Sequence, residues 1–136
     1  MLNTETEEWT QGPAMKERRT SHSCFYDKKS NSVYVTGGYN NKNRILTTTE
    51  KWNLDTNQWE LTQSLPEPLS SAAGVASKSI DYIGFVAGGQ TNYGKTTKLF
   101  GLRRRDLKWE IMPQRLQTAR RYHSMVNLPS DQVPGC

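Results

Sequence analysis

Two stretches of the chain end in the same pair of glycines: SVYVTGG, from Ser32 to Gly38, and YIGFVAGG, from Tyr82 to Gly89. Each is a short run rich in β-branched and aromatic residues, which favours a β-strand. The glycine pair permits backbone angles and close approaches that a larger side chain would block. Two similar strands with the same ending indicate an internal repeat.

The tryptophans give the period of this repeat. Trp9, Trp59 and Trp109 are spaced 50 residues apart, and NTETEEW, which ends at Trp9, aligns with NLDTNQW, which ends at Trp59. The related sequences RRTSHS, PLSSAA and RRYHS then follow at matching positions, and a glycine pair comes after the first two. A period of this length is typical of repeat architectures such as solenoids and propellers.

Four β-strands fit within one period. We expect them near residues 22–26, 33–36, 47–54 and 59–62, because sequences rich in turn-forming residues separate these runs. No stretch shows the sustained 3.6-residue apolar period of an amphipathic helix. A four-stranded unit of about 50 residues is typical of a propeller blade, so the sequence predicts an all-β fold with almost no helix.

The order of these features resembles the kelch repeat. Arg-x-x-His, an apolar run, Gly-Gly, Glu-x-aromatic and Trp occur in the kelch order over nearly the whole chain. The resemblance implies a kelch-type β-propeller fragment of about two and three-quarter four-stranded antiparallel blades. Residues 1–14 would be the tail of a preceding blade, 15–62 and 65–112 two blades, and 112–136 the start of a truncated blade. Since propellers close with about four to eight blades, we expect missing blades from a parent chain, or self-association.

The recurring residues are expected to be structural. In the kelch family the glycine pair ends the second strand of a blade, and the tryptophan of the fourth strand packs against the neighbouring blade. The structural motif residues are Arg19, Gly37, Gly38, Glu50, Trp59, Gly88, Gly89 and Trp109. Leu69 and Phe100 stand at the positions of Arg19 and Glu50 in the second blade. Joint loss of both charges predicts that this pair is in contact, because one member alone would leave a buried charge. Independent drift in a weak repeat is the alternative.

The sequence offers no catalytic, cofactor or metal site. His22 and His123 occupy equivalent repeat positions in different blades, so we expect structural histidines that do not share a metal ion. Cys24 and Cys136 lack the spacing of a zinc site or a disulfide framework. No nucleophile elbow, phosphate-binding loop or dinucleotide fingerprint occurs. The prediction is a protein that is not an enzyme, and a fragment of a kelch-type oxidase or sialic-acid epimerase is an alternative.

Charge and hydropathy narrow the class of partner. The net charge is +5, from 18 basic and 13 acidic side chains. We expect Arg103–Arg105 in a turn at the rim opposite the partner-binding loops, which argues against one continuous basic surface and therefore against nucleic acid. The N-terminal sequence MLNTETEEW is acidic and polar, unlike a secretory signal. No apolar run approaches the roughly 20 residues of a membrane helix, so we expect a cytoplasmic protein.

The kelch resemblance implies a protein–protein interaction scaffold. It could be the substrate-recognition part of a ubiquitin-ligase adaptor, and an actin-binding kelch protein is the alternative. In that family the partner surface combines loops after the glycine pair with segments that lead into the first strand. The partner-binding candidates are Ser21, Tyr39, Asn40, Arg44, Ser71, Gln90, Asn92, Tyr93 and Tyr122. Ser21, Ser71 and Tyr122 share one repeat position. Because Lys42 and Arg44 make this rim basic, we expect an acidic peptide as the ligand.

Overall fold

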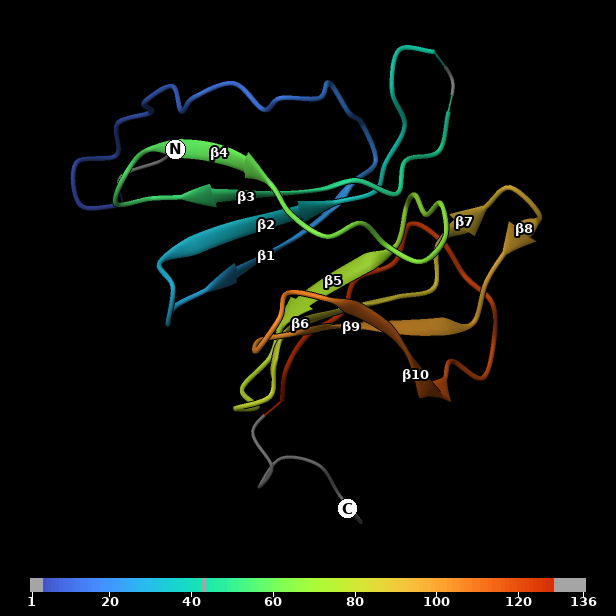
Figure 1. Ribbon diagram of the computed structural model, residues 1–136. Helices are drawn as coiled ribbons and strands as arrows, with labels where there is room; N and C mark the ends of the chain where they lie inside the picture. Colours follow the sequence, from blue (N-terminus) through green and yellow to red (C-terminus); the bar gives the residue numbers. More distant parts are fainter. Residues whose placement is uncertain (1–3, 43, 129–136) are drawn as a thin grey trace.

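The structure, a computed structural model, describes residues 4–42 and 44–128. Within these residues the strands form two four-stranded antiparallel sheets and one two-stranded sheet (Figure 1). No described residue lies in a helix. The predicted all-β fold is confirmed, and with it the four-stranded antiparallel unit.

The first sheet follows the chain from strand to strand. It contains β1 (Ser23–Asp27), β2 (Ser32–Thr36), β3 (Thr49–Asn53) and β4 (Gln58–Leu61), each paired with the next. The burial of β1 alternates strictly, with three inward side chains buried and two exposed, as expected of a strand with one face on a core. The bounds expected from the sequence differ from the observed ones by at most two residues.

The second sheet repeats this order one period later. Its strands are β5 (Ala73–Ala76), β6 (Tyr82–Ala87), β9 (Lys98–Arg103) and β10 (Trp109–Arg115). Between β6 and β9 the chain forms a small hairpin of β7 (Gln90–Thr91) and β8 (Gly94–Lys95). The corresponding loop of the first sheet contains only isolated bridges.

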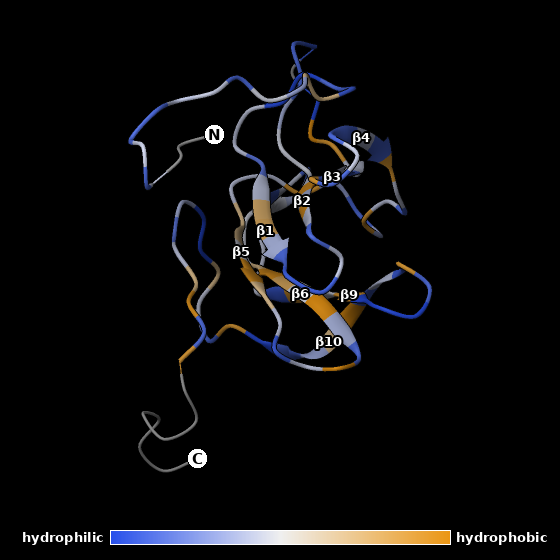
Figure 2. Ribbon diagram, turned by 90° about the vertical axis from the view of Figure 1, so that its left-hand side faces the viewer, coloured by the Kyte–Doolittle hydropathy of each residue, from blue (hydrophilic) through white to orange (hydrophobic). Residues whose placement is uncertain are grey.

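A shared apolar core joins the two sheets. Its buried members are Phe25, Tyr34, Leu65, Leu69, Ile83, Val86, Phe100, Leu102 and Trp109. Figure 2 shows hydrophobic stretches of β1, β5, β6 and β9 close together. Gly84 makes room for a ring, because a Cβ there would lie 2.5 Å from the ring of Phe25. Trp109 also donates its Nε1–H to Thr49 Oγ1 across the interface, at 3.0 Å.

The glycine pairs lie where the chain leaves each sheet close to another backbone. Gly37 and Gly38 have φ angles of 65° and 96°, and the second pair repeats them at 62° and 97°. A Cβ on Gly37 would lie 2.1 Å from the carbonyl oxygen of Leu69, which belongs to the segment that leads into the second sheet. Gly38 donates its N–H to the same carbonyl at 2.8 Å. Both the left-handed backbone and the close approach therefore require glycine.

Two expected parts of the repeat do not form strands. Trp9 was expected in the fourth strand of a preceding blade, but its side chain is 78% exposed and residues 4–19 lie in no named strand. A first strand was expected after His123, yet residues 123–128 are not in a strand either. A first strand needs a second strand beside it, and the residues expected to begin that second strand, DQVPGC at 131–136, lie outside the described residues. The expected end of an earlier third strand, residues 1–3, also lies outside them.

Candidate functional site

The connections of both sheets fall on two opposite edges. One edge, the loop rim, carries the loops after the glycine pairs and the segments that lead into the first strands: residues 16–22, 39–42, 44–48, 66–72, 90–97 and 116–122. The other edge, the turn rim, carries the tight turns at residues 28–31, 54–57, 77–81 and 104–108. In Figure 1 the hairpin β7–β8 and the loop after β2 mark the loop rim, on the right.

On the loop rim the two kinds of segment are directly bonded. Thr20 and Tyr39 exchange two backbone hydrogen bonds of 2.9 and 2.8 Å. Ser70 and Gln90 exchange another two, of 3.0 and 2.8 Å, at the equivalent place in the second sheet. The loop after each glycine pair and the segment that leads into the same sheet therefore form one continuous surface in both repeats.

Ser21, Ser71 and Tyr122 line up along this rim. All three have a left-handed backbone, with φ of 52°, 54° and 57°. Ser71 donates its N–H to the carbonyl of Ser21 at 2.8 Å, and Tyr122 donates to the carbonyl of Ser71 at 3.0 Å. Such backbone angles are uncommon outside glycine and often occur at binding sites. Ser71 is only 7% exposed, so it offers little surface to a partner, whereas Ser21 and Tyr122 are exposed.

Two candidate tyrosines present their rings to solvent. Tyr93 is fully exposed at the tip of the β7–β8 hairpin, next to exposed Asn92. Tyr122 is 73% exposed, and the Arg121 guanidinium lies over its ring at 5.3 Å from the centroid. Arg121 also donates to the side-chain oxygen of Gln90 at 3.2 Å. Arg121 thus joins the exposed ring of Tyr122 to the side chain of Gln90 in the second repeat.

The loop after Gly38 holds its shape through Asn40. The side-chain oxygen of Asn40 accepts the backbone N–H groups of Lys42 and Arg44 at 3.0 and 3.2 Å. Its own N–H donates to the carbonyl of Arg44 at 3.2 Å. This local bonding fixes where the two basic side chains leave the backbone.

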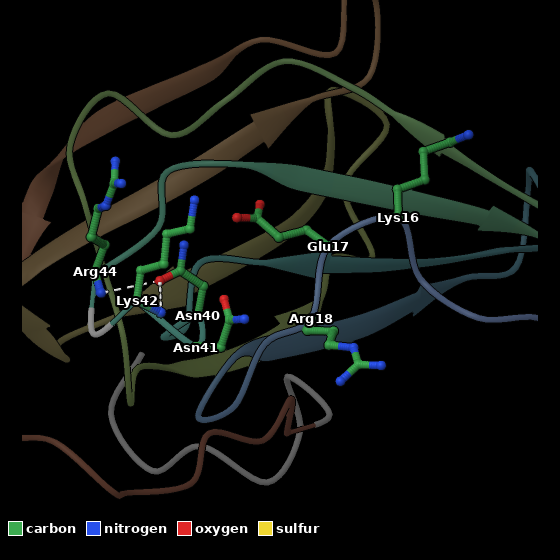
Figure 3. Close-up of a pocket in the computed structure, with 7 residues that line it drawn as sticks. All are labelled: Lys16, Glu17, Arg18, Asn40, Asn41, Lys42 and Arg44. Atoms are coloured by element: carbon green, nitrogen blue, oxygen red, sulfur yellow. Dashed lines mark hydrogen bonds between the residues drawn. The ribbon is translucent and has the colours of Figure 1, made fainter.

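A polar hollow opens between this loop and the segment that leads into β1. The basic hollow, of about 340 Å³, is lined by Lys16, Glu17, Arg18, Asn40, Asn41, Lys42 and Arg44 (Figure 3). A second hollow, of about 210 Å³, shares three of these residues and adds Arg19, Thr20 and Tyr39. Because they share residues, the two hollows form one basic groove whose lining includes Tyr39.

A buried ion pair supports the floor of this groove. Arg19 Nη2 lies 2.8 Å from Glu50 Oε1, and neither side chain is exposed. Arg19 also donates to the carbonyls of Gly37 and Thr48, at 2.8 and 3.0 Å. Glu50 accepts the backbone N–H of Lys16 at 2.7 Å. The contact expected from the repeat is present, and it ties the lead-in segment to the glycine loop.

The two repeat tryptophans contact different neighbours. Trp109 is buried against the first sheet, as expected for a blade-to-blade contact. Trp59 stacks on Trp52, with ring centroids 5.6 Å apart, and donates its Nε1–H to the carbonyl of Pro13 at 2.9 Å. Trp59 therefore packs beneath the N-terminal segment and not against the second sheet.

The arginines of the turn rim are paired with carboxylates. Arg104 forms a bidentate pair with Asp27, with nitrogen–oxygen distances of 2.9 and 3.1 Å. Arg103 Nη2 lies 2.6 Å from Asp106 Oδ2, and Nη1 lies 3.5 Å from Glu110. The turn at Arg103–Arg105 is therefore largely neutralised, in contrast to the basic hollow on the loop rim.

His22 and His123 border the same hollow although they belong to different repeats. The hollow, of about 260 Å³, also includes Cys24 and Gly74. The first strands of the sheets lie very close there, since a Cβ on Gly74 would be 2.9 Å from the Cys24 carbonyl. Burial lowers the pKa of both imidazoles, and nearby arginines lower it further.

The described residues contain neither a metal-binding cluster nor a membrane-spanning helix. Within residues 4–42 and 44–128, no group of three or more His, Cys, Asp and Glu side chains is placed to hold a metal ion. In the same part of the chain, no helix is long and apolar enough to cross a membrane.

Comparison with known proteins finds kelch repeats, in agreement with the repeated four-stranded sheets. Residues 30–66 match the family model of the Kelch motif. A RING finger domain and kelch repeat-containing protein of Dictyostelium discoideum is 33% identical over 113 residues, which is 82% of this chain and 11% of that protein. The chain belongs to the kelch-repeat family. Kelch-like protein 23 of mouse and of human is 37% identical over 68 residues, 49% of this chain and 12% of each relative.

The kelch chain thus spans only about a tenth of the length of these relatives. Its two sheets are kelch blades, and kelch repeats serve as scaffolds for protein–protein interaction.

Sequence reasoning missed two features of these blades. Lys16 was not among the candidate residues, although its alternation with Arg18 around Glu17 was a readable signal for a basic strip. The bidentate pair of Asp27 and Arg104 gave no signal, because neither residue recurs at the equivalent position of the other repeat.

Proposed function

We propose that the loop rim binds an acidic peptide segment of a protein partner. The observation that carries the proposal is the paired backbone bonding of Thr20 with Tyr39 and of Ser70 with Gln90, which makes one surface from the two loop sets. On this rim, the cations Lys16, Arg18, Lys42 and Arg44 have no carboxylate partner among the described residues, while Arg103 and Arg104 of the turn rim are engaged with carboxylates. Complementary charge speeds encounter and selects the partner.

In this proposal the aromatic side chains supply most of the contact energy. Tyr39, Tyr93 and Tyr122 lie along the rim, and exposed tyrosine rings beside arginine are typical of interface hot spots. Asn40, Gln90 and Asn92 provide hydrogen-bonding groups for an extended peptide backbone. In this proposal Ser21, which lies between the two repeats, contacts the bound peptide as well.

We further propose that these blades act as the substrate-recognition part of a ubiquitin-ligase adaptor. The relative from Dictyostelium is a RING finger domain and kelch repeat-containing protein, which combines the two modules in one chain. A partner-binding rim is the part that kelch blades would contribute to such an assembly.

Selection from a displayed library of random peptides tests the peptide-binding proposal. The 136-residue chain should enrich acidic sequences, and Tyr39→Ala combined with Arg44→Ala should weaken the selected peptides at least tenfold. The matched control removes one exposed tyrosine from β1 and one cation from the turn rim, Tyr26→Ala with Lys28→Ala, and should leave binding unchanged. Thermal melts establish that both variants fold. Equal binding by the rim variant, or loss in the control alone, would refute the proposal.

A further inference from the structure

We propose that the basic hollow binds the phosphate group of a phosphorylated serine or threonine in a protein segment. This inference rests on the proposed function, because the phosphorylated residue would belong to the peptide held on the loop rim. It goes further by assigning the ligand chemistry of one subsite.

The first observation is an excess of unpaired cations. Four basic side chains line the hollow: Lys16, Arg18, Lys42 and Arg44. Among the described residues, none of the four lies within ion-pair distance of a carboxylate, whereas Arg19, Lys51 and Arg104 all have such partners. Lys42 and Arg44 rise from one loop on the same side of the hollow, so their charges repel each other, and an anion placed between them reduces that repulsion.

The second observation is that the loop presents its cations in a fixed arrangement. Asn40 holds the backbone N–H groups of Lys42 and Arg44. Figure 3 shows both basic side chains rising from the loop on one side, facing the segment that carries Glu17. Lys16 and Arg18 extend from that segment further out, at the margins of the hollow. Lys42 and Arg44 are therefore the central phosphate ligands, with the other two adding long-range attraction.

The charge balance favours a dianion over a carboxylate. Glu17 is the one carboxylate among the seven lining residues, and it is already engaged. Its Oε2 accepts the Thr48 hydroxyl at 2.6 Å and lies 3.5 Å from Arg19. An aspartate or glutamate ligand would leave two positive charges uncompensated in the lining, and a phosphate close to −2 would leave one. Phosphate also offers three acceptor oxygens, which suits donors placed on different segments.

The neighbouring hollow offers space for the residues that flank the phosphorylated one. It shares Arg18, Asn40 and Asn41 with the basic hollow, and Tyr39 is part of its lining. A phosphorylated side chain in the basic hollow would therefore leave the next residue of the segment beside the ring of Tyr39. The subsite and the peptide-binding rim are continuous.

An NMR titration of the ¹⁵N-labelled 136-residue chain tests this. The probe is N-acetyl-O-phosphoserine N-methylamide, and the matched probe is N-acetylglutamate N-methylamide at the same concentration. We expect shifts centred on the amides of residues 16–18, 40–42 and 44, with at least tenfold weaker binding of the glutamate probe. Lys42→Ala with Arg44→Ala should reduce phosphoserine binding at least tenfold. Lys28→Ala with Lys29→Ala, which removes the same charge from the turn rim, should not.

Three outcomes would overturn the inference. They are equal affinity for the two probes, shifts centred elsewhere, and undiminished binding by the Lys42 and Arg44 variant with its spectrum intact. Acidic peptides that bind the rim without any preference for phosphoserine would remove the phosphate subsite and leave the proposed function standing. Phosphoserine binding by a chain that selects no rim-binding peptide would refute the proposed function and leave the phosphate-binding hollow standing. Tighter binding of inorganic phosphate or of phosphoinositide vesicles than of the phosphoserine probe would identify a different source of phosphate.

Discussion

Arg19 and Glu50 make a local network that the second blade has replaced with apolar packing. In the first blade the pair is buried and bonded to the backbone on both sides. In the second blade Leu69 and Phe100 occupy the same positions and are 2% and 0% exposed within the core. The same pair of positions thus holds a buried ion pair in the first blade and two apolar side chains in the second. Both charges change together because either charge alone would remain buried without a partner.

A double-mutant cycle on this pair measures the coupling. Arg19→Leu or Glu50→Gln alone should lower the free energy of unfolding by about 3–5 kcal/mol, because each leaves its partner buried and unpaired. The double variant should lose less than the sum, with a coupling of about 1–3 kcal/mol in urea denaturation.

The control is the partly exposed pair of Lys51 and Glu60, whose nitrogen–oxygen distance is 3.0 Å. Its cycle should give a coupling below about 1 kcal/mol. Equal coupling in the two cycles would show that burial of Arg19 and Glu50 is not what makes their contact strong.

Comparison of the two repeats in the sequence predicted some residue contacts and equivalent positions. Alignment of the two periods exposed the Arg–Glu pair and the shared position of Ser21, Ser71 and Tyr122. Alignment could not reveal that Ser71 is buried, because exposure depends on how the neighbouring blade packs over it. It also could not reveal that His22 and His123 border one hollow, since a sequence period does not report how closely the first strands of the two sheets approach.

Among the elements, the ends of β1 and β9 are joined by the pair of Asp27 and Arg104. The two residues belong to different blades, so their bidentate contact links one sheet to the other at the turn rim. Burial alone would raise the pKa of Asp27, but hydrogen bonds from Arg104 and Ser30 outweigh it and hold that pKa below its usual value.

This pair should make stability depend on pH. Because the folded pKa of Asp27 is lowered, the unfolded chain takes up a proton first as the pH falls, so the contribution of the pair is present above about pH 4 and lost below it. Asp27→Asn should lower the free energy of unfolding at pH 7 by about 1–3 kcal/mol and flatten its decline below pH 4. Urea denaturation from pH 7 to pH 3 measures both.

Asp81→Asn, which changes an exposed carboxylate on the same rim, serves as the control and should follow the wild-type curve. An Asp27→Asn curve parallel to wild type down to pH 3 would show that this carboxyl does not titrate with a lowered pKa.

Strand positions were predictable because each strand is a run of apolar and β-branched residues bounded by turn-forming residues. The strand expected after His123 was not formed, although its sequence resembles that of the earlier first strands. A strand is stabilised by hydrogen bonds to its neighbour, so local sequence alone does not determine whether it forms.

At the scale of the whole molecule, one face of the second sheet is not covered by another sheet among the described residues. Val75, Phe85 and Leu99 are the repeat counterparts of Phe25, Tyr34 and Thr49. In the first blade those positions are covered by the second blade, through the ring of Trp109 among others. In the second blade they line an apolar hollow of about 330 Å³, together with Met112, Gln114, Met125, Val126 and Asn127. The incomplete set of blades expected from the sequence therefore leaves an apolar surface, which these residues form.

An open blade face of this kind should make the 136-residue chain associate with itself. The contact that joins the two blades buries the same repeat positions, so a blade face from a second copy is a suitable cover, and burial of apolar surface stabilises it. We expect sedimentation velocity to show a weight-average mass that rises with protein concentration. Leu99→Lys should return the chain toward monomer, because it places a charge in the centre of the open face while the core between the blades is untouched.

Ile80→Lys is the matched control, since Ile80 is 75% exposed on the turn rim, away from the open face. It adds the same charge and should leave association unchanged. A chain that stays monomeric at all concentrations and melts in one sharp transition would mean that the segment after His123 already covers the face sufficiently. An equal loss of association in both variants would mean that net charge, and not the open blade, controls it.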